Sequence, residues 1–207
     1  MNYLSSLLLT LSSNFDTISV SLSFGMKKIH INKTSTLLTA IFTSLGTFIS
    51  MYLGKVLLHF IDPNLSNQFG GTLLSFIGVY FIIEYIRLKK KNNGYDTSHY
   101  IGDDSHYKNI LEDPIILDVN KSNHIDLLEA LILSTALTIN NLIIGIGAGI
   151  AGISISISVF LNFIVTILSI YCGNFICSTY LSSLLKKYNN LISGTILIIV
   201  GILKFII

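Results

Sequence analysis

The sequence predicts an all-α membrane protein with six transmembrane helices, and three observations support this fold class. Of the 207 residues, 12% are charged, whereas soluble domains contain about 25%. Residues 130–185 contain no Asp, Glu, Lys or Arg, and Asp16 is the only charged residue among residues 1–26. The apolar runs are continuous and about 20 residues long, which is the length that a helix needs to cross the bilayer core.

All six spans are expected to be helical, because a segment in lipid must satisfy its backbone N–H and C=O groups internally. Strands of a membrane barrel would be about ten residues long and would alternate strictly between polar and apolar residues. The first span has no basic start and contains an acid, so we expect a span and not a cleavable signal peptide. The spans are expected at about residues 3–25, 35–59, 69–87, 127–150, 154–181 and 190–207.

Basic residues indicate how the spans are oriented. They gather in the connections after the first, third and fifth spans, so the positive-inside rule places these connections in the cytoplasm and both termini outside. We therefore expect a multi-pass protein of the cell membrane, with the lipid bilayer as partner and the oligomeric state left open. No nucleic acid is expected as partner, because no basic run alternates with aromatic residues. The basic residues on which this orientation depends are Lys27, Lys28, Lys33, Arg87, Lys89, Lys90, Lys91, Lys186 and Lys187.

Matches between the two ends of the chain indicate an internal repeat of three spans. The alternative is chance similarity among apolar helices, but the matches occur in the same order at offsets of 119, 123 and 124 residues. They join residues 50–55 (SMYLGK) to 169–174 (SIYCGN), residues 71–74 (GTLL) and Gly78 to residues 194–197 (GTIL) and Gly201, residues 14–16 (NFD) to 138–140 (TIN), and Gly25 to Gly149.

An odd number of spans in each repeat gives the two copies opposite orientations, so the fold is expected to consist of two inverted three-helix repeats. The first repeat is expected at residues 1–88, a cytoplasmic acidic loop at 89–126 and the second repeat at 127–207. Many secondary transporters are built from inverted repeats, with the substrate near the bilayer midplane where the repeats meet.

Asp16 lies near the middle of the first span, where an ionised carboxylate is costly and should face the bundle interior with a partner. If the repeats pack as expected, Asp16 faces Asn140 of the second repeat. The surrounding hydroxyls and amides would complete an oxygen-rich cage of the kind that Mn²⁺ or Mg²⁺ prefers. The alternative is an inert, hydrogen-bonded structural acid. The expected transport residues are Asp16, Asn140, Asn141, Ser12 and Thr138.

Glu84, near the cytoplasmic end of the third span, is a further candidate for the transport site. The alternative is an acid at the membrane interface that pairs with Arg87 three residues later. The sequence does not separate these two interpretations.

Several of these motifs together resemble the MntP-type manganese efflux pumps, and the resemblance covers all six spans. The long acidic loop and residues 139–141 (INN) look more like the YtaF-type sporulation membrane proteins of the same family. The resemblance implies Mn²⁺ export and a transport site with one Asp in each repeat. Asp16 matches the first Asp, but the second position is Asn140, which removes one negative charge. The motifs are residues 14–16 (NFD) with Gly25, the copy around Asn140, and residues 76–78 (FIG) with 82–84 (IIE).

Residues 118–129, at the end of the acidic loop, have the pattern of an EF-hand loop for Ca²⁺ or Mn²⁺. Oxygen-bearing side chains stand at loop positions 1, 3, 5, 9 and 12, and position 8 is Ile. Position 6 is Asn123 in place of the usual Gly, and Asn tolerates positive φ. Alternatively, or in addition, Asp126 and Glu129 cap the fourth span. The expected ligands are Asp118, Asn120, Ser122, the His124 carbonyl, Asp126 and Glu129.

Together these features predict a secondary transporter that exports a divalent cation, with the EF-hand-like loop as a cytoplasmic cation sensor. The resemblance to the YtaF-type proteins implies a link to sporulation. The second hypothesis is a sporulation membrane scaffold or regulator that keeps the transporter fold without transporting. No enzyme activity is expected, because the sequence contains no nucleophile with an adjacent base and no phosphate-binding glycine loop. No resident cofactor is expected beyond the divalent cation.

Overall fold

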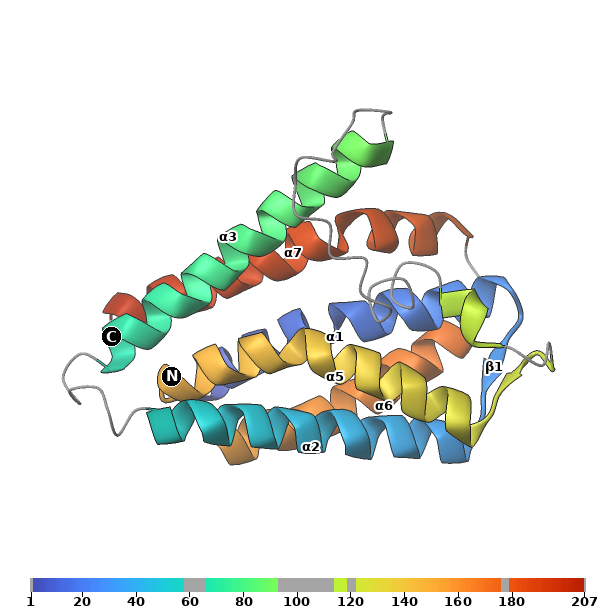
Figure 1. The fold of residues 1–207 in the computed structure, drawn as a ribbon, viewed down its shortest axis with the longest axis horizontal. Coiled ribbons are helices and arrows are strands. Elements are labelled where there is room, and N and C mark those ends of the chain that lie inside the picture. Colours follow the sequence, from blue (N-terminus) through green and yellow to red (C-terminus); the bar gives the residue numbers. More distant parts are fainter. Residues whose placement is uncertain (1, 58–65, 93–113, 119–121, 176–178, 207) are drawn as a thin grey trace.

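The computed structural model describes residues 2–57, 66–92, 114–118, 122–175 and 179–206, and long helices dominate it (Figure 1). Most of the predicted acidic loop, residues 93–113, lies outside the described residues. The elements are, in order, α1 (Asn2–Met26), β1 (His30–Ile31), α2 (Lys33–Leu57), α3 (Ser66–Asn92), the 3₁₀ helix η2 (Pro114–Leu117), β2 (His124–Ile125), α5 (Leu127–Ile150), α6 (Ile155–Phe175) and α7 (Thr179–Ile206).

Among the described residues, five helices are long and apolar enough to cross a membrane, which supports the all-α membrane fold. The helix α1 is as long, at 25 residues, but is rich in Ser and Thr. Several of these hydroxyls bond to carbonyls of their own helix, for example Thr10 to Ser6 and Ser21 to Thr17. The first predicted span therefore forms a helix, and its passage through the membrane stays a prediction. The five segments are Lys33–Leu57, Asn67–Lys89, Leu127–Ile150, Ile155–Gly173 and Lys187–Ile206.

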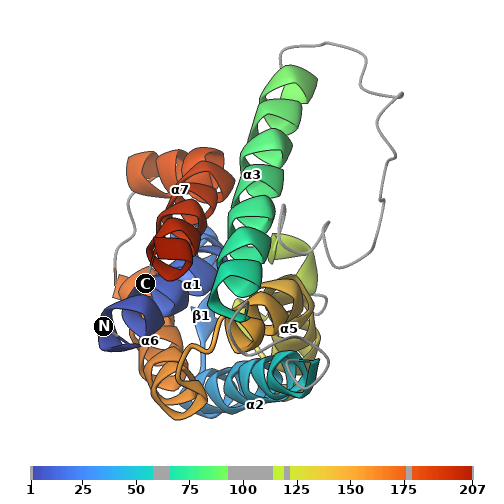
Figure 2. The same cartoon turned by 90° about the vertical axis from the view of Figure 1, so that its left-hand side faces the viewer.

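The helices of the first half of the chain pack mainly against helices of the second half. The pairs α2–α5, α1–α6 and α3–α7 run along each other, and α1–α7, α2–α6 and α3–α5 also make contact. Seen end-on, α1, α2, α5 and α6 lie together, and the α3–α7 pair crosses one side of them (Figure 2). Both termini lie at one end of the bundle, and β1 lies at the other (Figure 1).

The outer face of the bundle is apolar, and the buried face carries many small polar residues. Large apolar side chains on the outside include Phe48, Phe76 and Phe160. An exposed apolar surface that extends over several helices is typical of a protein that faces lipid. Inside, one cluster around Phe24, Ile125 and Leu133 lies toward the end that holds the strands.

Two short strands that the sequence did not predict join the connection after α1 to the segment before α5. β1 and β2 pair in parallel, with His30 opposite His124 and Ile31 opposite Ile125. The residue before β2, Asn123, has a φ of 60°, which is the positive φ expected at position 6 of the EF-hand-like loop. The strand pair places two of the three predicted cytoplasmic connections at the same end of the bundle.

The last two helices differ from their predicted bounds. α6 ends at Phe175 and α7 begins at Thr179, whereas the sequence predicted spans at about 154–181 and 190–207. Lys187 and Asn189 are therefore in a helix and not in a loop. The apolar run underestimates the length of α7, because hydropathy marks only the part of a helix inside the hydrocarbon core. Outside the core a helix can continue with polar side chains.

Glycines let α3 and α7 approach until their backbones touch. A Cβ atom placed on Gly78 would lie 2.6 Å from the Gly194 carbonyl oxygen, and one on Gly71 would lie 2.6 Å from that of Gly201. Neither position has room for a side chain, so the crossing depends on small residues, as is common between membrane helices.

We predict that Gly78→Ala lowers the thermal stability of the protein in detergent micelles. The added methyl group has to push the two backbones apart, and overpacking of this kind costs about 1–3 kcal/mol. The control is Val79→Ala, because Val79 is the next residue and its side chain is exposed. Equal melting temperatures for the two variants would show that the close crossing contributes no stability.

Candidate functional site

One carboxylate in the helix bundle is bound by two amides from different helices. The two oxygens of Asp16, in α1, accept hydrogen bonds from the Nδ2 groups of Asn140, in α5, and Asn189, in α7. We call Asp16, Asn140 and Asn189 the Asp16 amide cluster. It joins one helix of the first half of the chain to two helices of the second half.

The contact between Asp16 and Asn140 is the one that the repeat analysis expected, and its role in transport stays a prediction. Asn189 was missed because the predicted sixth span began one residue later, at about residue 190. One signal in the sequence could have indicated it: Asn189-Asn190 repeats the pairing of amides in Asn140-Asn141, next to an apolar run.

The other predicted transport residues make different contacts. The Ser12 hydroxyl donates to the Ser193 carbonyl at 2.9 Å, and the Ser193 hydroxyl returns a bond to the Ser12 carbonyl at 3.1 Å. Thr138 packs on Gly46 of α2. Both Thr138 Oγ1 and Asn141 Oδ1 are buried without a hydrogen-bond partner among the described residues. The structure therefore links Ser12 to α7 and Thr138 to α2.

Glu84 pairs with Arg87, with 3.5 Å between the charged groups, as in the second of its two interpretations. Both side chains are partly buried, at 16% and 22% exposure, so solvent screens this pair only in part. The ion pair accounts for the acid in this helix, and a transport role for Glu84 remains only a prediction.

A second buried polar network connects α1 to α6 and α2. Asn14 donates to Asn162 Oδ1 at 2.6 Å, and Thr166 donates to Asn14 Oδ1 at 2.8 Å. The Thr166 hydroxyl lies 3.5 Å from that of Thr43. Asn162, a polar residue in an apolar helix, thus accepts an interhelical hydrogen bond.

The described part of the EF-hand-like loop is held by its own side chains. The Asp118 carboxylate accepts hydrogen bonds from the backbone N–H groups of Ser122, at 2.9 Å, and Asn123, at 3.1 Å. Glu129 is buried and accepts a bond from the Asp126 N–H at 3.0 Å as part of a capping box. The capping interpretation is therefore confirmed. The expected ligand Asn120 lies outside the described residues.

Oxygen atoms of amides and hydroxyls would have to supply most ligands to a cation at the Asp16 amide cluster. In the part of the chain that the structure describes, no three side chains of His, Cys, Asp or Glu are grouped so that they could hold a metal ion. A site with one carboxylate and neutral oxygens suits a hard cation better than a soft one.

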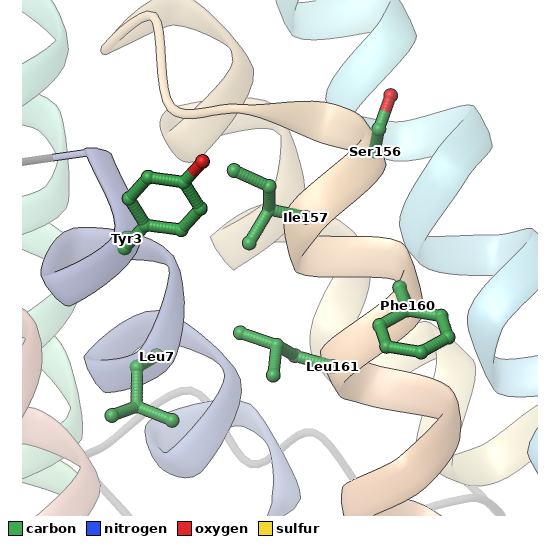
Figure 3. A pocket seen from close by; sticks show the side chains of 6 residues that line it. All are labelled: Tyr3, Leu7, Ser156, Ile157, Phe160 and Leu161. Atoms are coloured by element: carbon green, nitrogen blue, oxygen red, sulfur yellow. The ribbon is translucent and has the colours of Figure 1, made fainter.

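A hollow on the bundle surface lies between the N-terminal part of α1 and the start of α6 (Figure 3). Its lining is almost wholly apolar and includes none of the residues of the Asp16 amide cluster. Such a lining offers few hydrogen-bond partners to a polar ligand. It is lined by Tyr3, Leu7, Ser156, Ile157, Phe160 and Leu161.

Comparison with known proteins agrees with the resemblance found in the sequence. Residues 112–205, which include α5, α6 and α7, match the family model described as "Putative manganese efflux pump". The chain is 29% identical over 164 residues to the "Probable sporulation protein YtaF" of Bacillus subtilis (strain 168), a match that covers 74% of this chain and 76% of that protein. No solved structure matches the chain.

The family is one of membrane transporters and not of enzymes, and the apolar helices agree with a multi-pass protein of the cell membrane. The matched model covers the second half of the chain, which contributes Asn140 and Asn189 to the cluster. The sporulation relative covers most of both chains. The chain is therefore similar over its second half to the manganese efflux pump family, and over most of its length to the sporulation protein YtaF.

Proposed function

We propose that this protein exports a divalent cation of the Mn²⁺ type from the cell, with the Asp16 amide cluster as its transport site. The observation that carries the proposal is the Asp16 carboxylate, which lies within the bundle and is bound by amides of α5 and α7. Ionisable residues inside membrane spans are costly, and they commonly mark the path of an ion. The family match indicates the transported ion, because the matching family model is described as a manganese efflux pump.

The two halves of the chain act as inverted repeats in this proposal. The repeat aligns Gly71 with Gly194 and Gly78 with Gly201. When each glycine is replaced by its aligned partner, the Gly71–Gly201 contact becomes the Gly194–Gly78 contact. The same exchange relates the pair α1–α6 to α2–α5, and Asp16 to Asn140. Both relations support a pseudo-twofold axis through the α3–α7 crossing and the Asp16 amide cluster.

Alternating access then follows from a movement of one repeat against the other. The cluster lies where α1 of the first repeat meets α5 and α7 of the second, so its geometry changes when the repeats move. We place the β1–β2 end in the cytoplasm and the termini outside, on the basis of the basic connections.

The EF-hand-like loop has a regulatory role in this proposal, as a cytoplasmic site for Ca²⁺ or Mn²⁺. Support comes from the positive φ of Asn123, from the buried Ile125 at position 8, and from Glu129 at the start of α5. A cation on this loop would act directly on the helix that carries Asn140.

A second candidate function is a sporulation membrane protein that does not transport. Asn140 favours it, because the resemblance implies an Asp at this position and the cluster contains one carboxylate where two are implied. The relative named as a sporulation protein favours it as well. Manganese accumulation in cells that express an Asp16 variant separates the two candidates.

We predict that Asp16→Asn abolishes manganese export. Cells that express the protein should accumulate less manganese than cells without it, and the variant should return accumulation to the level without the protein. The control Asp96→Asn, in the acidic loop, should behave as the unmodified protein. Equal accumulation with the unmodified protein and Asp16→Asn would favour the non-transporting candidate.

We predict that Asn140→Asp strengthens Mn²⁺ binding by the purified protein roughly tenfold, because ligand charge tunes the affinity of sites for divalent cations. Binding is measured by Mn²⁺ titration with paramagnetic resonance. The control Asn67→Asp adds a carboxylate at the exposed start of α3. An affinity that rises equally in both variants would mean that the added charge acts nonspecifically.

We predict that Glu129→Gln reduces Ca²⁺ or Mn²⁺ binding at the loop of the full-length protein at least tenfold, since position 12 supplies a bidentate ligand. Calorimetric titration measures the change, and Asp118→Asn provides a second variant that leaves the capping box in place. Identical titrations for the unmodified protein and both variants would remove the loop site while leaving the transport proposal intact.

A further inference from the structure

We infer that Asn189 is a cation ligand in the Asp16 amide cluster, and that it exchanges its amide nitrogen for its amide oxygen when the ion enters. The inference rests on the proposed function, because it concerns the ion that the cluster carries. It assigns a binding role to α7, from which the sequence analysis drew no ligand.

The amides of Asn189 and Asn140 together occupy both oxygens of Asp16. An ionised carboxylate only accepts hydrogen bonds, so each amide has to turn its NH₂ group toward it. This arrangement satisfies the charge of Asp16 while no ion is bound, since each oxygen receives a donor. It also directs an N–H group at each oxygen, and these positive groups disfavour a cation beside Asp16 unless the amides turn.

The amide oxygen of Asn189 is left without a partner by the same arrangement. Asn189 Oδ1 is buried and has no hydrogen-bond partner among the described residues. A buried polar atom without a partner is unfavourable, because it has lost its hydrogen bonds to water. A cation would provide the missing partner for this oxygen.

A rotation of the side chain is sufficient to make the exchange. The terminal torsion of Asn is broad and roughly twofold, so a half-turn brings Oδ1 to the place of Nδ2 with little change elsewhere. If both amides turn, carboxylate and amide oxygens from α1, α5 and α7 face a common point. Amide carbonyls are established ligands of hard divalent cations.

The competing explanation is that Asn189 only fastens α7 to α1, as the reciprocal bonds of Ser12 and Ser193 do one turn further along. A purely structural amide would influence the reactivity of Asp16 in the absence of ion. It would not change the Mn²⁺ concentration that protects Asp16, and this difference can be measured.

The test is the labelling of Asp16 by a hydrophobic carbodiimide, located by peptide mass spectrometry and followed as Mn²⁺ is added to the purified full-length protein. Asn189→Leu removes the amide at similar volume, and Asn189→Asp keeps an oxygen ligand. The matched control is Thr195→Ala, because Thr195 is exposed on the same helix and bonds only to the Leu191 carbonyl in the described structure.

We expect Mn²⁺ to protect Asp16 in the unmodified protein and in Thr195→Ala at the same concentration. Asn189→Leu should need at least about tenfold more Mn²⁺ for half-protection, as is usual when a residue that supports a metal site is lost. Asn189→Asp should need no more Mn²⁺ than the unmodified protein. If Asn189→Leu does not fold, the Asp variant alone decides, and a need for more Mn²⁺ would contradict the inference.

Two outcomes separate the inference from the function on which it rests. Protection of the unmodified protein together with an unchanged midpoint in Asn189→Leu would overturn the inference and leave the proposed function standing. An absence of protection in the unmodified protein at millimolar Mn²⁺ would overturn both.

Discussion

The position of one carboxylate within a bundle of apolar helices constrains much of this structure. Asp16 needs hydrogen-bond donors that lipid cannot provide, so α5 and α7 have to bring amides to α1. The same constraint agrees with the many Ser and Thr residues of α1, which packs against α6 and α7. Several of its hydroxyls, such as those of Thr10 and Ser21, are satisfied by carbonyls of its own backbone, which keeps the helix compatible with a membrane.

Close packing follows from the need to hold these donors in place. The two amides reach Asp16 because α1, α5 and α7 lie close together in this conformation. The α3–α7 crossing places glycine against glycine, and the Ser12–Ser193 bonds fix α7 against α1 near the cluster. The site and the core are therefore parts of one arrangement, in which the position of α7 is set from both sides.

The sequence predicted the helices and one essential contact of the site, because both follow from strong local patterns. Long apolar runs define the membrane helices, and the aligned motifs around Asp16 and Asn140 identify residues that meet in space. Asn189 could not be found in this way, since hydropathy locates the hydrocarbon core and not the end of a helix. The polar pattern of the sequence also grouped Thr138 and Ser12 with Asp16. Helical spacing alone does not show that Thr138 points to Gly46 and that Ser12 bonds to Ser193.

The strand pair β1–β2 has a mechanical consequence for any movement of the two halves. It joins the connection after α1 to the segment before α5, so one main-chain pairing bridges the first and second halves of the chain. Rotation of one half relative to the other must either pivot at this bridge or break its hydrogen bonds, each worth about 0.5–1.5 kcal/mol. Separation of the halves is therefore easier at the opposite end of the bundle, where the termini lie (Figure 1). The strand pair therefore acts as a hinge between the two halves, and the end that holds the termini is the end that opens.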